Sequence, residues 1–161
     1  MKRRFFNLGF ATVFLLLVGC GSIPDSTSSN PQQQAPNPAA PPEEIAIGKT
    51  IYAANCAGCH GENLEGEADW KQQNEDGSFR SPPHSADGHT WHHADSILIE
   101  AITKGGARYE DLNIGGFSNM PAFDDILTDV EIAAVLTYIK STWPEDVRAL
   151  QWQQTIQNLS Q

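Results

Sequence analysis

Apolar side chains recur at helical spacing in three segments of the chain, and each segment carries the end signals of a helix. In the first segment Ile47, Ile51 and Ala54 lie three or four positions apart, behind a pair of acidic residues that favour a helix N-terminus. This pattern predicts a helix that ends where Cys56 begins.

The other two predicted helices are delimited by caps and helix breakers. Residues 95–104 are predicted to form a helix that is closed by the two glycines following it. Further along, Thr128 and Glu131 have the spacing of a capping box. The apolar stripe behind that box consists of Ile132, Val135, Leu136 and Ile139. Pro144 is predicted to stop this last helix.

No segment has a convincing strand pattern and no internal repeat is present, so the predicted fold class is all-α. Long connections rich in glycine and proline join the helices. Such connections are uncommon in a compact domain unless something organises them, and a large apolar cofactor would do so. The folded domain is predicted to span residues 43–146, with a C-terminal tail at 147–161.

The N-terminus has the pattern of an export signal. A cationic start precedes an apolar run that is shorter than the roughly 20 residues of a membrane span. The sequence LVGC, which ends at Cys20, resembles the lipobox of bacterial lipoproteins. The resemblance implies a signal peptide at 1–19 and a diacylglycerol on Cys20, and the alternative is an ordinary secretory signal with a chance cysteine. An exported, lipid-anchored protein facing the periplasm or cell exterior is therefore expected.

Residues 20–42 are rich in Pro, Ser, Gln and Asn and have almost no apolar bulk, so a disordered linker is expected. The whole chain has a formal net charge of −10, and removal of 1–19 takes away three basic residues (Lys2, Arg3 and Arg4) and no acids, which gives −13. This charge excludes a general nucleic-acid binder, which needs a basic surface. It suits plain solubility or a partner with a basic docking patch.

Two of the three cysteines, Cys56 and Cys59, lie in CAGCH and are followed at once by His60. A zinc site would normally need a second pair of ligands, a redox dithiol would need a βαβ setting, and a disulfide across so short a loop would stabilise little. None of these sites uses the histidine. Attachment of c-type haem uses all three residues, because each thiol adds to a haem vinyl group and the histidine becomes an axial iron ligand. One covalent haem c is therefore predicted.

The second axial ligand is predicted to be Met120, the one methionine left after leader removal. An isolated methionine more often fills a gap in the core. This one, however, lies in the glycine-rich stretch GGFSNMPAF directly before the last helix, 60 residues after His60. That position favours binding of its sulfur to iron.

Together these features resemble class I cytochrome c over residues 44–144. The resemblance rests on CAGCHG after a first helix, NMPAF before a last helix, and DSILIEAITKGG between them. It implies three to five helices wrapped around one covalently bound haem. It also implies that Gly48 in the first helix allows Tyr138 of the last helix to cross closely.

The resemblance further implies that a proline carbonyl accepts a hydrogen bond from the other ring nitrogen of His60. Pro82, or Pro83 beside it, is the candidate. The polar stretch EGEADWKQQNEDGSFR departs from the family pattern, because it lengthens the loop before this proline.

A histidine cluster follows the prolines and consists of His84, His89, His92 and His93. One hypothesis is a copper or other metal site, or a competing axial ligand. The other is a solvated loop in which Trp91 packs near the haem edge and donates its indole N–H to a propionate, while His84 packs where the family has an apolar residue. Arg108 is a further candidate haem contact, as the partner of a propionate. The alternative is that its side chain is solvated.

With His60 and Met120 both bound, iron has no open position, so single-electron transfer by Fe(II)/Fe(III) cycling is the predicted function. No catalytic residues are predicted, and the protein is not expected to be an enzyme. The expected partners are redox proteins of a respiratory or photosynthetic chain, such as a quinol-oxidising complex or a terminal oxidase, and a membrane reached through Cys20. The alternatives are a haem peroxidase, or a haem- or copper-binding sensor or metal-handling protein using the histidine cluster.

Overall fold

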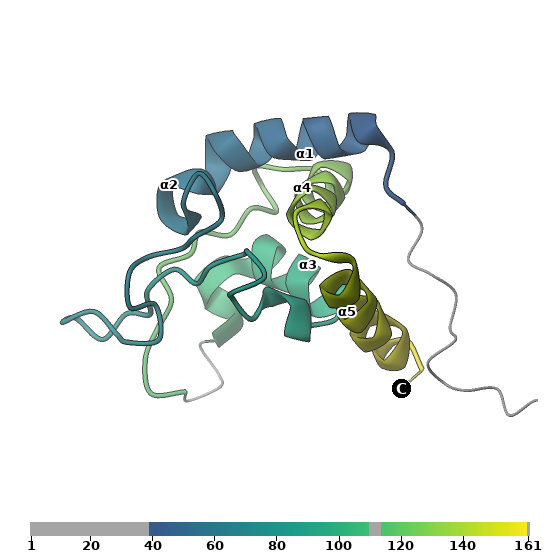
Figure 1. Ribbon diagram of the computed structural model, residues 1–161. Helices are drawn as coiled ribbons and strands as arrows, with labels where there is room; N and C mark the ends of the chain where they lie inside the picture. The colour runs from purple at the N-terminus through teal and green to yellow at the C-terminus, as the bar shows by residue number, and fades with distance from the viewer. Residues whose placement is uncertain (1–38, 110–113, 161) are drawn as a thin grey trace, which may run out of the picture. The chain divides into compact units, whose positions relative to one another are not determined.

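The computed structural model describes residues 39–109 and 114–160 (Figure 1). Its α-helices are α1 Pro42–Asn55, α2 Ala57–His60, α3 Asp95–Lys104, α4 Asp129–Ser141 and α5 Glu145–Asn158, and 3₁₀ turns occur at η2 Thr90–His92 and η3 Gly105–Tyr109. Strand pairing in the described residues is limited to two isolated bridges, Gln73 with Phe79 and Ser78 with Phe117. The predicted all-α fold is confirmed.

The predicted signal peptide, the lipidation site Cys20 and the linker up to residue 38 lie outside the described residues. None of the helices that are described is long and apolar enough to cross a membrane.

The three predicted helices are present, although α4 ends at Ser141, before the predicted stop at Pro144. Helix α1 ends at Asn55, directly before the first cysteine of the pair, and α3 ends at Lys104, directly before the predicted glycines. Helix α4 has both halves of the capping box, since the Glu131 N–H donates to Thr128 Oγ1 at 3.3 Å and the Thr128 N–H donates to Glu131 Oε2 at 2.8 Å.

Helices α1 and α4 cross at a very short distance, and Figure 1 shows α1 running across α4. Gly48 is buried at the crossing, and a Cβ placed there would collide with the carbonyl oxygen of Ala134 and lie 2.9 Å from Cβ of Tyr138. The close approach implied by the family resemblance is therefore present. Beside it the core is built around Tyr52 and Trp143, which are 1% and 2% exposed.

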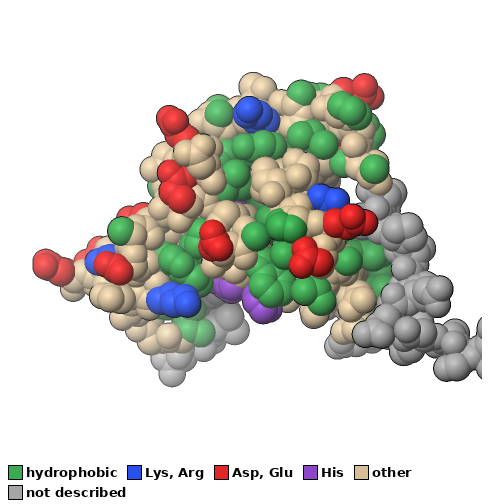
Figure 2. Space-filling model, in the orientation of Figure 1, with side chains coloured by type: hydrophobic (Ala, Val, Ile, Leu, Met, Phe, Trp, Pro, Cys, Tyr) green, Lys and Arg blue, Asp and Glu red, His purple; other side chains and the backbone are tan. Residues whose placement is uncertain are grey.

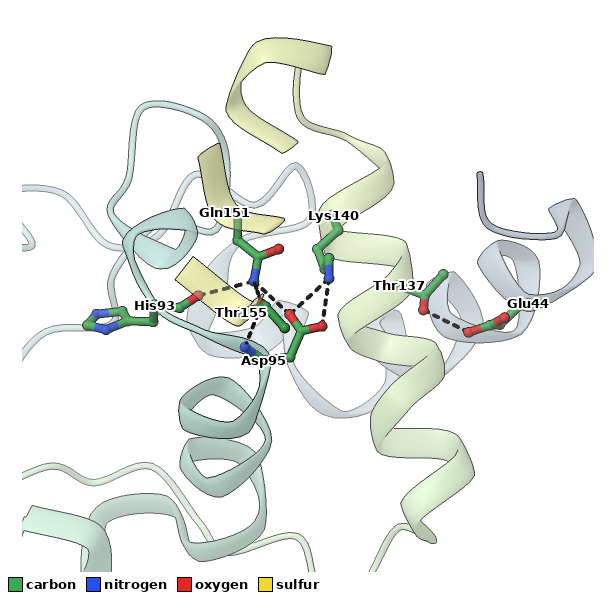
Figure 3. A network of polar contacts seen from close by, with 7 residues as sticks. All are labelled: Glu44, His93, Asp95, Thr137, Lys140, Gln151 and Thr155. Carbon is green, nitrogen blue, oxygen red and sulfur yellow. Dashed lines mark hydrogen bonds and ion pairs between the residues drawn. The ribbon is translucent and has the colours of Figure 1, made fainter. Parts of the chain in front are cut away.

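The segment predicted as a C-terminal tail is a helix over most of its length. Helix α5 buries Gln151 and Thr155 and packs against α3 and η2. Asp95 at the start of α3 accepts hydrogen bonds from Lys140 of α4 at 2.9 Å and from Gln151 Nε2 at 2.6 Å (Figure 3). Because α5 buries polar side chains instead of an apolar stripe, its apolar pattern is weak.

Candidate functional site

The two thiols and the histidine of CAGCH lie on one helical turn. The peptide N–H of Cys56 still bonds to Tyr52 O at 2.8 Å, and the N–H of His60 bonds to Cys56 O at 2.9 Å, so the chain passes from α1 into α2 almost without interruption. Residues three and four positions apart in a helical turn share one face. Cys56, Cys59 and His60 have this spacing, and both thiols are free, Cys59 exposed and Cys56 partly buried.

The ring of His60 is buried, with 7% of the residue exposed, and its orientation is fixed by a backbone carbonyl. Nδ1 lies 2.8 Å from the carbonyl oxygen of Pro82. The structure thus shows the proline contact that the sequence suggested, and it selects Pro82 over Pro83. With Nδ1–H donating to this carbonyl, Nε2 is left with its lone pair free.

Burial lowers the pKa of His60, and the hydrogen bond to Pro82 and the nearby Glu67 offset this only in part. The lowered pKa favours the neutral form of the ring. A neutral imidazole is the form that binds a metal ion.

Short backbone bonds hold the segment with Pro82 against the CAGCH turn. The Gly66 N–H donates to His60 O at 2.8 Å, and the His84 N–H donates to Leu64 O at 2.9 Å. Leu64 is buried and adopts a positive φ of 63°, a conformation that is costly for a leucine and that aims its carbonyl at the proline segment. The position of the Pro82 carbonyl is therefore set by the fold around it.

His84 stacks on His60, with ring centroids 4.1 Å apart and ring planes at 24°. Its Nδ1 lies 2.9 Å from Thr90 Oγ1, and its carbonyl accepts the indole N–H of Trp143 at 2.7 Å. Burial, with a smaller effect of the neighbouring histidines, lowers the pKa of His84 to about 3, so this ring is neutral. His84 is partly buried, and its stacking on the other histidine has no signal in the sequence. Its packing at the position where the family has an apolar residue stays a prediction.

The remaining histidines pair with aromatic rings. His89 stacks on Trp70 at 5.1 Å and contacts His93 edge-on at 5.4 Å, while His92 stacks on Trp91 at 3.7 Å. Within residues 39–109 and 114–160 no group of three or more His, Cys, Asp or Glu side chains could hold a metal ion. The hypothesis of a metal site in the histidine cluster finds no support there.

The predicted role of the Trp91 indole N–H is corrected by the structure. That N–H donates to the carbonyl of Ala86 at 3.1 Å, within its own loop, and so is not directed at a propionate. Trp91 itself is partly buried against the core around Tyr52. Arg108 has a carboxylate partner in the chain, with its Nε 3.7 Å from Glu100 Oε2.

Met120 lies in a loop that is attached to the end of α3. The Gly106 N–H donates to Met120 O at 2.7 Å, and the Met120 N–H donates to Ser118 Oγ at 3.2 Å. The partly buried Met120 side chain packs against a second apolar cluster, which comprises Phe123, Leu127 and Ile132 with Ile51 and Ile102 beside them. The sulfur-bearing side chain is thus held among residues from α1, α3 and α4.

Comparison with protein families gives a match to the cytochrome c model over residues 45–143. The chain belongs to the cytochrome c family. The match covers more than half of the chain, includes both the CAGCH turn and Met120, and ends before α5. No curated protein and no solved structure matches this cytochrome c.

Membership of the family means a covalently attached haem c and a function in electron transfer. The side chains at the site fit this group. Two free thiols share a helical face with a buried histidine whose Nδ1 is engaged. Its Nε2 has no hydrogen-bond partner among the described residues. When bound, the haem supplies a one-electron iron couple, and the protein determines its surroundings.

Proposed function

We propose that this cytochrome is of class I, with His60 and Met120 as the axial iron ligands, and that it carries single electrons between redox proteins. The observation that carries the proposal is the His60 ring, which is buried and fixed through Nδ1 by Pro82 at 2.8 Å, beside the two free thiols. This arrangement presents Nε2 as a ligand while the thiols provide the covalent attachment.

In this proposal each side chain has a separate part. Cys56 and Cys59 hold the haem by thioether bonds, and the Pro82 carbonyl keeps the His60 ring in one tautomer and raises its basicity as a ligand. The thioether of Met120 raises the reduction potential relative to histidine ligation alone. Two protein ligands leave no position for a substrate, so the site is suited to transferring electrons.

Replacement of Met120 tests the ligand assignment. In haem-loaded Met120→Ala the oxidised protein is expected to lose the iron–thioether charge-transfer band, become high-spin and bind azide. In Met120→His it is expected to stay low-spin with a lowered reduction potential. Spectroscopy and potentiometry on the full chain measure both effects.

His89→Ala is the matched control for a competing histidine ligand. His89 is exposed and stacks on Trp70, so this variant is expected to keep the spectrum and potential of the wild type. A charge-transfer band that survives in Met120→Ala, or that disappears in His89→Ala, would contradict the assignment of Met120.

The proposal includes a membrane anchor and a periplasmic or external location. It is supported by the lipobox-like LVGC ending at Cys20 and by the polar composition of the segment after it. Cys20→Ser is expected to move the cytochrome from the membrane fraction to the soluble fraction, and the N-terminal peptide of the wild type is expected to show the mass of a diacylglycerol. An unmodified Cys20 in the membrane-bound protein would refute the anchor.

The negative net charge of the chain supports partners with a basic docking surface. Figure 2 shows many acidic and few basic side chains on the displayed face. A quinol-oxidising complex as donor and a terminal oxidase as acceptor are the partners proposed. Electron-transfer rates to such partners are expected to fall as ionic strength rises.

A further inference from the structure

The polar stretch that departs from the family pattern docks on the loop leading to Met120. We call residues 67–80 the hairpin, because Gln73 and Phe79 form an antiparallel bridge and the Asn74 N–H donates to Ser78 O at 2.9 Å. The Phe79 N–H donates to the carbonyl of Phe117 at 2.8 Å, and the Phe117 N–H donates more weakly to Gly77 O at 3.5 Å. The hairpin and the residues just before Met120 therefore lie side by side (Figure 1).

A side chain and a glycine complete this contact. Gln73 Nε2 donates to the carbonyl of Gly115 at 2.9 Å. A Cβ placed on Gly116 would collide with Gln73 Nε2 and lie 2.8 Å from both Gly77 O and a ring carbon of Phe79. The backbones approach so closely only because residue 116 has no side chain.

The hairpin has its own internal support, so it can restrain another segment. Ser78 is 1% exposed and donates both its N–H and its Oγ–H to Asp76, at 2.9 and 2.7 Å. Arg80 Nε bonds to Asn74 Oδ1 at 3.2 Å, and Arg80 Nη1 bonds to the Ala68 carbonyl at 2.8 Å. These bonds tie the turn to both arms of the hairpin.

Phe117 and Met120 are three positions apart in the chain, and the bond from Gly106 to Met120 O anchors the same loop from its other side. We propose that the hairpin restrains this loop and thereby limits the departure of Met120 from the iron. Gln73, Gly116 and Phe79 are then positioning residues for the sulfur ligand. This inference rests on the proposed function, in which Met120 binds iron.

An added ligand can replace Met120 only if the loop moves. Breaking one hydrogen bond of the contact changes an equilibrium by a factor of about 2 to 10, which corresponds to a net bond strength of roughly 0.5 to 1.5 kcal/mol. A weakened hairpin contact should therefore make the oxidised cytochrome bind free imidazole more tightly.

The test uses the haem-loaded full chain and measures imidazole affinity in the oxidised state. Gly116→Ala, which forces the two backbones apart, is expected to raise the affinity about 10-fold, and Gln73→Ala about 3-fold. Amide exchange at Phe79 and Phe117 should become faster in both variants. Gln72→Ala is the matched control, since Gln72 is an exposed neighbour of the same type whose side chain has no hydrogen bond in the described part of the chain. It should bind imidazole like the wild type.

Wild-type imidazole affinity in both Gly116→Ala and Gln73→Ala would overturn the inference. If Gly116→Ala does not accumulate as folded protein, Gln73→Ala decides alone, because it only removes a surface hydrogen bond. Failure of the proposed function has a different signature, namely the absence of the iron–thioether band in the wild type itself.

Discussion

The two sides of the candidate haem site are held in different ways. On the histidine side, three residues of one helical turn supply the thiols and the imidazole, and Pro82 fixes the ring through a single hydrogen bond of 2.8 Å. On the methionine side, Met120 lies outside any helix and depends on bonds from distant segments, such as that from Gly106. The position of the imidazole is thus set by local chain geometry, whereas that of the thioether is set by tertiary contacts.

Each side is supported by a segment that is not part of the family pattern. Helix α5 lies beyond the matched residues and packs against η2, close in sequence to the stacked His84. It is joined to the rest through Asp95, Lys140 and Gln151, which are largely buried (Figure 3). The hairpin contacts the methionine loop through backbone bonds and one amide side chain near the surface. We therefore expect α5 to affect global stability and the hairpin to affect ligand exchange.

The largest expected effect comes from the helix crossing, on which both sides depend. In Gly48→Val the new side chain collides with the Ala134 carbonyl, and backbone atoms at a helix crossing cannot move aside easily. We expect the free energy of unfolding of the haem-loaded protein to fall by about 3 kcal/mol or more, as measured by urea denaturation. Ala46→Val, at an exposed position of α1, is the control for the helix propensity of valine and should cost under about 1 kcal/mol. A similar loss in both variants would argue against the close crossing.

The second-largest expected effect tests whether the histidine side can be destabilised without disturbing the methionine side. Lys140→Met removes the partner of Asp95 from a pair whose side chains are only 13% and 25% exposed, and leaves the carboxylate with Gln151 alone. We expect the free energy of unfolding, measured by urea denaturation, to fall by about 2 kcal/mol. Amide exchange should become faster in α5 but stay unchanged at Phe79 of the hairpin.

Lys104→Met makes the same substitution in the exposed ion pair with Glu100, whose side chains are 58% and 39% exposed. This control substitution should lower the free energy of unfolding by less than about 0.5 kcal/mol. Equal losses in the two lysine variants, or faster exchange at Phe79 in Lys140→Met, would remove the distinction between the two sides.

Much of the fold and of the histidine side could be predicted because their signals are local. The capping box at Thr128 and the glycines after Lys104 mark helix ends within a few residues, and CAGCH carries its ligand geometry in its own spacing. The contact of His60 with Pro82 was predictable through the family resemblance, and the structure was needed to choose between the two adjacent prolines.

The rest depends on tertiary contacts that leave little trace in an apolar pattern. Helix α5 is packed through Gln151 and Thr155, so a search for apolar stripes overlooks it. Its signals are the acidic first turn after Pro144 and the four-residue spacing of the two buried positions, 151 and 155, with partly buried positions at 147, 148, 152, 153 and 156. The docking of the hairpin has no comparable signal, since backbone atoms, a glycine and one amide side chain make the contact.

The smallest expected effect is a pH dependence confined to the hairpin on the methionine side. Hydrogen bonds from the Ser78 hydroxyl and N–H lower the pKa of Asp76, because they favour the carboxylate. A carboxyl whose pKa is lowered on folding stabilises the fold above its unfolded pKa, and this contribution is lost as pH falls through the folded value. The hairpin contact should therefore weaken in acid.

The Ser78 amide proton reports this titration in NMR spectra, and its midpoint should lie below the ordinary range of aspartate. Asp76→Asn retains an acceptor oxygen but has no charge to lose, so its Ser78 signal should lack this acid-dependent step. Glu75→Gln, at the exposed neighbour, should retain the step, because the Glu75 side chain has no hydrogen bond in the described residues. An acid-dependent step that persists unchanged in Asp76→Asn would place its origin outside the hairpin and would remove Asp76 from the set of residues that restrain the methionine loop.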